Sequence, residues 1–438
     1  MSNESPIWNP EFETMSRQQL QEVQLQRLKT TVERAYHKVP FYKRALDEKG
    51  IKPDDIKTID DLRKLPFTYK QDFRDTYPFG LFAEPLENVV RLQATSGTTA
   101  KPIIVGYNRN DLESWAEVNA RSLSACGVTK YDIVQNAYGY GLFTGGLGVH
   151  LGAERIGATV IPISGGLSQR QLMFLEDVGS TVLTCTPSYA LSLVETMEDT
   201  KVDRNKIKLR VGIFGAEPWS EAMRDEIESR WKILALNIYG LAELTGPGVG
   251  CECTQKAGMH IWEDYFIPEI IDPITGDPLP YGQEGELVFT SLKKEVLPVI
   301  RYRTRDRTHL IAEPCACGRT HVRMGRITGR TDDMLVIRGV NLFPSQIETA
   351  ILRVPEIEPQ YVIVVDRQQT QLDNIEVRAE ATEELWAKGQ EAIDAVIARL
   401  RHEIHEVTLL NVIVKVVEPK SIQRSEGKAK RVFDLREL

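Results

Sequence analysis

The chain has 438 residues, of which 42% are hydrophobic and 26% are charged, and its formal net charge is -8. This composition is typical of a globular protein with room for more than one domain. The acidic balance argues against nucleic acid or an anionic membrane as a partner, because either would require a basic face. The opening residues, MSNESPIWNPEF, contain no basic segment followed by an apolar run, so we expect no signal peptide and a cytoplasmic location.

The first predicted element is an amphipathic helix over residues 14–39, which Pro40 ends. Farther along, short apolar runs alternate with helical patterns such as residues 220–231, where Ser220 is the expected N-cap. This alternation predicts a mostly parallel sheet covered by helices, with ligands beyond the carboxyl ends of the strands. The predicted strands are residues 132–138, 158–163, 180–185, 209–215 and 233–239.

After about residue 265 the pattern changes to strands and turns, and a new segment begins near residues 329–332. Beyond it we predict a small α+β domain, with a helix over residues 383–406 and strands at 361–366, 374–380 and 411–417. The sequence therefore predicts an α/β chain with two domains, residues 1–330 and 331–438.

Several motifs occur in the order found in the adenylate-forming superfamily: TSGTTAKP (95–102), FGAEP (214–218), NIYGLAELTG (237–246), IRYRTRD (300–306), GRTDDMLVIRG (329–339) and SEGKAKR (425–431). Over nearly its whole length the chain resembles the acyl-CoA synthetases of this superfamily, and most closely the phenylacetate–CoA ligases. The resemblance implies a large AMP-binding domain and a small C-terminal domain that rotates about a hinge. It also implies that ATP activates a carboxylate to an acyl-AMP with release of pyrophosphate, and that the acyl group then passes to the thiol of coenzyme A.

By this resemblance the segment at 95–102 is the phosphate-binding loop, with Ala100 where the family usually has glycine. Gly97 lets backbone N–H groups approach phosphate oxygens, and the hydroxyl donors are Ser96, Thr98 and Thr99. The spacing of a Walker A loop is absent.

The resemblance also assigns the remaining nucleotide contacts. Glu243 would hold Mg²⁺ against the phosphates, because this ion prefers carboxylate and phosphate oxygens. Asp306 would accept hydrogen bonds from the ribose hydroxyls, while Arg301 and Arg303 are interpreted as the solvent face of the same strand. The residues expected around the adenine are Gly215, Ala216, Glu217, Pro218, Tyr239 and Gly240.

Two further motifs relate to the half-reactions. Arg330 would reach a phosphate or ribose oxygen, and Asp332 would be the hinge. Lys428 matches the lysine that bridges the acyl carboxylate and the α-phosphate, where its charge offsets charge developing at phosphorus. For the acyl group, Tyr138 and Phe143 match positions that line an aryl pocket, together with Gly215. Aromatic residues after a strand can instead belong to the core.

Two close cysteine pairs, CEC (251–253) and CAC (315–317), suggest a metal site together with His260. Three thiolates and one imidazole make a tetrahedral zinc set. Cys251 competes with Cys253, since both share one face if the segment is extended, and unliganded reduced cysteines are the alternative to any metal. Because not all members of the resembled family carry these residues, a structural ion is implied. The chosen ligands are Cys253, His260, Cys315 and Cys317.

The leading hypothesis is an ATP-dependent aryl-acid–CoA ligase of the phenylacetate type, which uses Mg²⁺ and coenzyme A. One alternative keeps adenylation but transfers the acyl group to a carrier protein or a deazaflavin cofactor. Another is a catalytically silent nucleotide-binding protein. The acid stays open among phenylacetate, a hydroxylated phenylacetate, indoleacetate and a benzoate, and a homodimer is expected by resemblance alone.

Overall fold

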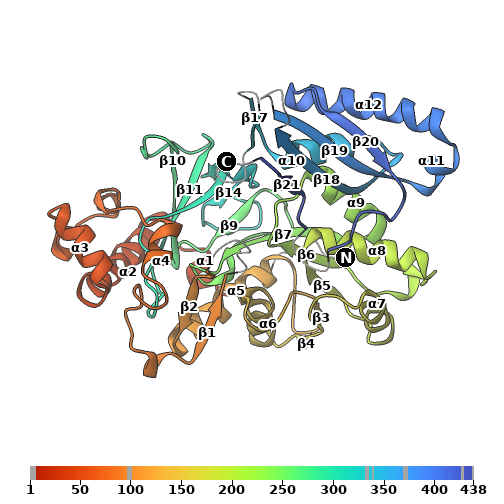
Figure 1. The fold of residues 1–438 in the computed structure, drawn as a ribbon. Coiled ribbons are helices and arrows are strands. Elements are labelled where there is room, and N and C mark those ends of the chain that lie inside the picture. The colour runs from red at the N-terminus through yellow and green to blue at the C-terminus, as the bar shows by residue number, and fades with distance from the viewer. Residues whose placement is uncertain are drawn as a thin grey trace. The chain divides into compact units, whose positions relative to one another are not determined.

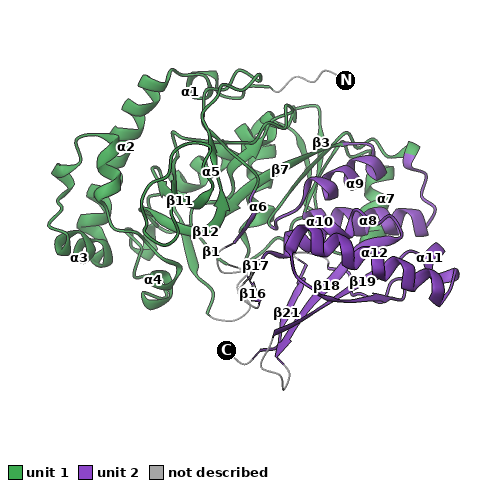
Figure 2. Ribbon diagram, turned by 90° about the horizontal axis from the view of Figure 1, so that it is seen from above, with its two compact units in different colours: residues 1–185, 205–216, 234–326 green, residues 186–204, 217–233, 327–438 purple. Residues whose placement is uncertain are grey.

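The computed structural model describes residues 6–95, 101–330, 335–337, 340–367, 373–425 and 429–436. These residues form two compact units (Figure 2). Unit 1 comprises residues 1–185, 205–216 and 234–326, and unit 2 comprises residues 186–204, 217–233 and 327–438. Unit 2 thus includes two segments from the middle of the chain, and the boundary at residue 330 stays a prediction.

Unit 1 begins with a series of helices that follow closely on one another in the sequence. The predicted helix over residues 14–39 is α2 (Arg17–Lys38), and α3 (Pro40–Glu48) starts directly at the proline that ends it. Ser16 caps α2, since its side chain accepts from Gln19 N and Gln19 Oε1 accepts from Ser16 N. The neighbouring short elements are α1 (Pro10–Glu13), η1 (Pro53–Asp55), η2 (Ile59–Lys64), α4 (Lys70–Asp75) and η3 (Leu86–Asn88).

The large sheet of unit 1 confirms the predicted parallel strands. In the described part of the chain, β4 (Thr159–Ile161), β3 (Ile133–Asn136), β5 (Val182–Cys185), β6 (Val211–Gly215) and β7 (Leu234–Leu241) are neighbours in this order and pair in parallel. The sheet continues antiparallel through β8 (Gly246–Glu252), β9 (Met259–Ile261), β14 (Arg323–Met324) and β13 (Leu310–Ile311). The connecting helices in unit 1 are α5 (Arg109–Ala125), α6 (Thr144–Ile156) and α7 (Ser168–Asp177), and α5 and α6 lie along one face of the sheet (Figure 1).

Smaller antiparallel sheets complete unit 1. Strands β1 (Arg91–Ala94) and β2 (Ile104–Tyr107) form a hairpin. Strands β10 (Phe266–Ile271), β11 (Gly285–Ser291) and β12 (Tyr302–Thr308) pair side by side. The motif at 300–306 therefore lies largely on β12, and the described flanks of the motif at 95–102 adjoin β1 and β2.

Unit 2 joins helices α8 (Pro187–Asp199) and α9 (Glu221–Trp231) to the C-terminal α+β segment. Ser220 caps α9 as predicted, because its Oγ accepts from Met223 N at 3.1 Å. In the C-terminal sheet, β18 (Ile357–Arg367) pairs with antiparallel β19 (Asp373–Ala381) and parallel β21 (Val432–Asp434), and β19 pairs with parallel β20 (Ile413–Val417). The other elements near or within unit 2 are η4 (Arg204–Lys206), β15 (Gly329–Arg330), β16 (Leu335–Ile337), β17 (Val340–Leu342) and α10 (Pro344–Ile351).

The predicted helix over residues 383–406 is wrong in one respect. It is two helices, α11 (Glu383–Ala387) and α12 (Gln390–Thr408), which lie end to end in Figure 1. Gly389 has φ 83°, a conformation that ends a helical run, so the apolar periodicity continues across a break in the backbone. Its predicted apolar face is largely buried in the core of the C-terminal segment, with Leu385, Leu400 and Ile404 at most 2% exposed.

Candidate active site

The expected phosphate-binding loop joins the two strands of the β1–β2 hairpin. On its flanks, Thr95 N donates to Ile103 O at 3.0 Å, and Ile103 N donates to Thr95 Oγ1 at 3.1 Å. The two ends of the loop are therefore closed onto each other. Its central residues fall outside the part of the chain that the structure describes: Ser96, Gly97, Thr98, Thr99 and Ala100.

The loop that follows β3 is tied to β1 directly before this segment. Ala94 N donates to Leu142 O at 2.9 Å, and the side-chain amide of Gln93 donates to Phe143 O at 2.9 Å. The two residues expected in an aryl pocket differ in burial, since Tyr138 is 7% exposed within the core and Phe143 is 46% exposed. The structure thus ties the candidate acyl loop to the end of β1, directly before the segment expected to bind phosphate.

The residues expected at the adenine and ribose meet across two sheets. Tyr239 lies on β7 and Asp306 on β12, and Tyr239 Oη donates to Asp306 Oδ2 at 2.6 Å. The ring of Tyr239 lies 6.2 Å from that of Phe289, and Asp306 is 4% exposed. The tyrosine therefore orients the carboxylate that is expected to bind the ribose.

Glu243 lies in the turn between β7 and β8, 5% exposed. Tyr302 Oη donates to its Oε1 at 3.1 Å, and Tyr302 is itself 3% exposed. A carboxylate has capacity for several ligands, so one neutral hydroxyl donor is compatible with a hard cation at the same group. Tyr302 is not among the predicted site residues, although it alternates with the arginines in RYRTRD and was therefore expected on the other face of the strand.

The interpretation of Arg301 and Arg303 as a solvent face is wrong. They are 4% and 8% exposed. Arg301 binds Glu269 through Nε and Nη2 at 3.0 and 2.9 Å, and Arg303 binds Glu286 through Nε and Nη2 at 3.1 and 2.5 Å. Each buried guanidinium is thus paired with a carboxylate on β10 or β11, which compensates the cost of removing its charge from water.

The segment expected beside the adenine begins at the carboxyl end of β6. A Cβ at Gly215 would lie 2.1 Å from the carbonyl oxygen of Ile238 on β7, so glycine is required there. Ala216 follows in a left-handed conformation with φ 70°, Pro218 is exposed, and Gly240 lies on β7 next to Tyr239.

The expected residues of unit 2 are described in part. Arg330 is the last residue of β15, and both Asp332 and Lys428 lie outside the described residues. The carboxylate of Glu217 binds two backbone amides of unit 2, Ser188 N at 2.8 Å and Ala429 N at 3.0 Å. The sequence analysis did not predict these contacts.

The chosen metal ligands come together in unit 1. One ligand atom from each of Cys253, His260, Cys315 and Cys317 lies within 4.8 Å of the others. Cys253 Sγ is 3.7 Å from Cys315 Sγ, and Cys317 Sγ is 3.3 Å from His260 Nε2. Burial lowers the pKa of His260, which favours the neutral imidazole that binds metals. Three sulfur donors and one nitrogen donor fit Zn²⁺.

Cys251 is directed elsewhere. Its Sγ lies 3.1 Å from Cys126 Sγ, and both residues are 0% exposed. Strand β8 ends at Glu252, so Cys253 is not part of the extended run and does not share a face with Cys251.

Residues 319–321, which follow Cys317, bind residues 12–15 of the N-terminal segment. Arg319 Nε binds Glu13 Oε2 at 2.6 Å with both side chains 0% exposed. His321 Nε2 lies 2.8 Å from Phe12 O, and Thr320 Oγ1 donates to Met15 O at 2.7 Å. The metal-ligand cluster is thus continuous with contacts that hold residues 6–15.

No helix in the described part of the chain combines the length and apolar character that a membrane span requires.

Known proteins match the chain over most of its length. The model of the AMP-binding enzyme family matches residues 16–292, and that of the AMP-binding enzyme C-terminal domain matches residues 339–436. The chain is 49% identical to the phenylacetate-coenzyme A ligase of Thermus thermophilus, over 98% of this chain and 100% of that protein. It is 51% identical to the phenylacetate-coenzyme A ligase of Escherichia coli, over 98% of this chain and 97% of that protein.

A solved ligase has the same fold. 2-Hydroxyisobutyryl-CoA ligase in the postadenylation state, in complex with 2-HIB-AMP, is 30% identical and gives a TM-score of 0.93 over 99% of this chain and 92% of that chain. The same ligase in the thioesterification state, with 2-HIB-AMP and CoA, gives 0.73 over 100% of this chain and 93% of that chain. The resemblance noted from the motifs is confirmed: the chain belongs to the AMP-binding enzymes and, within them, to the phenylacetate–CoA ligase family.

Proposed function

We propose that this chain is an ATP-dependent acid–CoA ligase whose acid is phenylacetate or a close aryl analogue. It would form the acyl-AMP with release of pyrophosphate and then transfer the acyl group to coenzyme A. The observation that carries the proposal is the near-full-length identity of about one half to phenylacetate-coenzyme A ligases. The hydrogen bonds that tie the loop after β3 to Ala94, beside the phosphate loop, support it.

In this proposal Ser96, Gly97, Thr98 and Thr99 bind the phosphates, and Glu243 holds Mg²⁺ against them. Asp306, oriented by Tyr239, binds the ribose, and the backbone of residues 215–218 lines the adenine. Lys428 stabilises the charge that develops as the carboxylate attacks the α-phosphate. Arg330 contacts a phosphate or ribose oxygen, and the C-terminal domain, from residue 331, turns about Asp332 between the half-reactions.

A screen of acids tests the substrate. Purified enzyme, ATP and Mg²⁺ are incubated with aryl and alkyl acids, and pyrophosphate release and thioester formation are measured with and without coenzyme A. We expect phenylacetate-type acids to give the highest kcat/KM, with thioester formed when coenzyme A is present. Pyrophosphate release without any coenzyme A thioester would favour a carrier protein or a deazaflavin as acceptor. No acid-dependent pyrophosphate would favour the silent nucleotide-binding alternative.

The metal proposal is a structural zinc ion held by Cys253, His260, Cys315 and Cys317. The mutual distances of at most 4.8 Å among the ligand atoms support it. Elemental analysis of the purified protein should give about one zinc per chain. Cys315→Ser should lose the metal, whereas Cys251→Ser, the matched control beside Cys126, should keep it. Well under one zinc per chain in the unmodified protein would end the proposal.

Location and assembly complete the proposal. A cytoplasmic location agrees with the six cysteines, which all lie in described segments and form no disulfide with one another. A homodimer is proposed by resemblance, and sedimentation of the purified enzyme at micromolar concentration tests it.

A further inference from the structure

The carboxylate of Glu217 binds two parts of unit 2, one 29 residues before it and one 212 residues after it in the sequence. Its Oε1 accepts from Ser188 N at 2.8 Å, and its Oε2 accepts from Ala429 N at 3.0 Å. Ser188 is the second residue of α8, where backbone amides point out of the helix and favour a negative charge. Ala429 is the residue that directly follows Lys428. One acidic side chain therefore binds the main chain directly after the expected catalytic lysine.

The loop that carries Glu217 is itself held firmly. Ser220 N donates to Glu348 Oε1 at 3.1 Å, and Tyr361 Oη lies 3.4 Å from Glu348 Oε2. Glu348 is 6% exposed on α10, and burial raises its pKa. Ser220, three residues after Glu217, is therefore held both as the N-cap of α9 and by the buried side chain of Glu348.

Other contacts hold the same C-terminal segment at a greater distance from Lys428. Arg424 Nε donates to Glu195 Oε2 at 2.8 Å, and its Nη1 and Nη2 donate to the carboxylate of Glu380 at 2.6 and 2.8 Å. Lys420 Nζ lies 2.8 Å from both oxygens of Asp199 with half-exposed side chains, so this pair contributes little.

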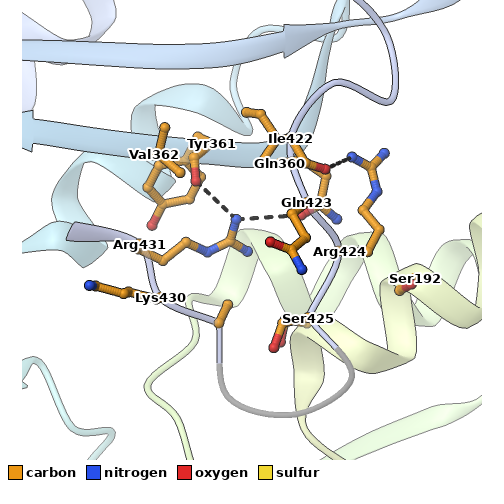
Figure 3. Close-up of a pocket in the computed structure, with 12 residues that line it drawn as sticks. Ser192, Gln360, Tyr361, Val362, Ile422, Gln423, Arg424, Ser425, Lys430 and Arg431 are labelled. Atoms are coloured by element: carbon orange, nitrogen blue, oxygen red, sulfur yellow. Dashed lines mark hydrogen bonds between the residues drawn. The ribbon is translucent and has the colours of Figure 1, made fainter. Parts of the chain in front are cut away.

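Figure 3 shows Arg424 and Ser425 on one side of a cavity of about 40 Å³, and Lys430 and Arg431 on the other. Ser188 and Ala429 also line this cavity. Arg431 also lines the cavity, and its Nη1 donates to Tyr361 O at 3.3 Å. The flanks on both sides of residues 426–428 are thus anchored, and the anchor nearest to Lys428 is the bond from Ala429 to Glu217.

We propose that Glu217 is a positioning residue for the adenylation half-reaction: it holds the main chain at Ala429, the residue after Lys428, and thereby supports the role proposed for that lysine. This inference rests on the proposed role of Lys428. Both carboxylate oxygens of Glu217 accept from backbone amides, so in this proposal Glu217 acts through the lysine. Thioester formation, which follows after the C-terminal domain has turned, does not depend on this bond.

Glu217→Gln tests the inference at constant side-chain size. The amide keeps one acceptor oxygen and replaces the other by a donor, so it can accept from only one of the two backbone amides. We expect acid-dependent pyrophosphate release to slow by about 10- to 100-fold, which is the usual effect of losing a hydrogen bond to a charged group. The KM for ATP and the rate of thioester formation from supplied acyl-AMP should stay unchanged. Glu217→Asp should give an intermediate loss in the first half-reaction.

The matched control is Glu221→Gln, which neutralises an exposed carboxylate in the first turn of α9 and should leave both half-reactions unchanged. Equal loss of both half-reactions by Glu217→Gln, or a raised KM for ATP at unchanged kcat, overturns the inference. An unchanged rate of acid-dependent pyrophosphate release in Glu217→Gln overturns it as well.

A double variant separates the inference from the proposed function. Because Glu217 acts through Lys428, Glu217→Gln added to Lys428→Ala should slow pyrophosphate release no further than Lys428→Ala alone. Additive losses overturn the inference while the role of Lys428 stands. Undiminished pyrophosphate release in Lys428→Ala overturns the role of Lys428, and the inference with it.

Discussion

Tyr239 Oη donates a 2.6 Å hydrogen bond to Asp306 Oδ2 and so joins β7 of the large sheet to β12 of its neighbour. The two residues come from separate motifs, and both were expected at the nucleotide. Their bond sets the orientation of the carboxylate before any ribose arrives.

Tyr239→Phe should therefore weaken nucleotide binding without removing the carboxylate. A hydrogen bond to a charged group contributes about 1.5–3 kcal/mol, so the KM for ATP should rise by about tenfold or more. Initial rates of pyrophosphate release against ATP concentration measure this effect. Tyr281→Phe, an exposed tyrosine of unit 1, is the control, and an unchanged KM in Tyr239→Phe would contradict the orienting role of Tyr239.

Glu243→Gln should weaken the site proposed for Mg²⁺. We expect the rate of adenylation to fall by about 10²–10³-fold, the effect of losing one electrostatic stabiliser, and excess Mg²⁺ to restore part of it. Tyr302→Phe removes the 3.1 Å hydrogen bond to Glu243 but keeps the carboxylate, so its effect should be smaller. If the two variants lose activity equally and neither responds to Mg²⁺, Glu243 does not hold the ion.

Much of the fold follows from local patterns in the sequence. The runs that became β3, β4, β5, β6 and β7 are short and apolar, and Ser220 caps α9 where the pattern placed it. The break at Gly389 escaped prediction, because the apolar face of α11 and α12 continues across it. The sequence also could not show that Arg301 and Arg303 are buried, since their partners Glu269 and Glu286 are distant in the chain.

The candidate site likewise has features that the sequence predicts and features that only the structure gives. Motif order and residue chemistry predict site roles for Tyr239, Glu243 and Asp306, but contacts between distant segments need the structure. The bond from Ala429 to Glu217 is one such contact, and the separation of Cys251 from Cys253 is another. The latter depends on where β8 ends, and strand ends are poorly determined by sequence patterns.

Removing the proposed zinc should loosen the N-terminal segment. Arg319, Thr320 and His321 follow the proposed ligand Cys317 in the sequence and bind three residues of the N-terminal segment, which are Phe12, Glu13 and Met15. Amide hydrogen exchange before and after chelation should therefore increase at residues 6–17. Exchange within α12 serves as the internal control and should not change. Equal protection of residues 6–17 with the metal removed would show that the N-terminal contacts do not depend on it.

The free energy of unfolding should depend on pH because Lys294 is buried. Lys294 is 5% exposed with its Nζ 3.5 Å from the centre of the Tyr107 ring, and burial lowers its pKa from 10.5 to about 8. Between these two values the unfolded chain binds a proton that the folded chain does not, so the free energy of unfolding rises with pH, by up to about 1.4 kcal/mol per pH unit. Below pH 8 both states are protonated and this contribution is constant.

Urea unfolding from pH 7 to pH 10.5 tests this expectation by comparison with Lys294→Met. The difference in unfolding free energy, unmodified enzyme minus variant, should increase with pH above about 8, whereas the exposed Lys130→Met should give a constant difference. Parallel curves for the unmodified enzyme and Lys294→Met would mean that Lys294 keeps an ordinary pKa in the folded state.

The most direct test of the central claim is the separate measurement of both half-reactions in Lys428→Ala. Acid-dependent pyrophosphate release should fall by about 10²–10³-fold, while thioester formation from supplied acyl-AMP and coenzyme A should continue at nearly the unmodified rate. Pyrophosphate release that is undiminished, or that falls no more than thioester formation does, would contradict the account.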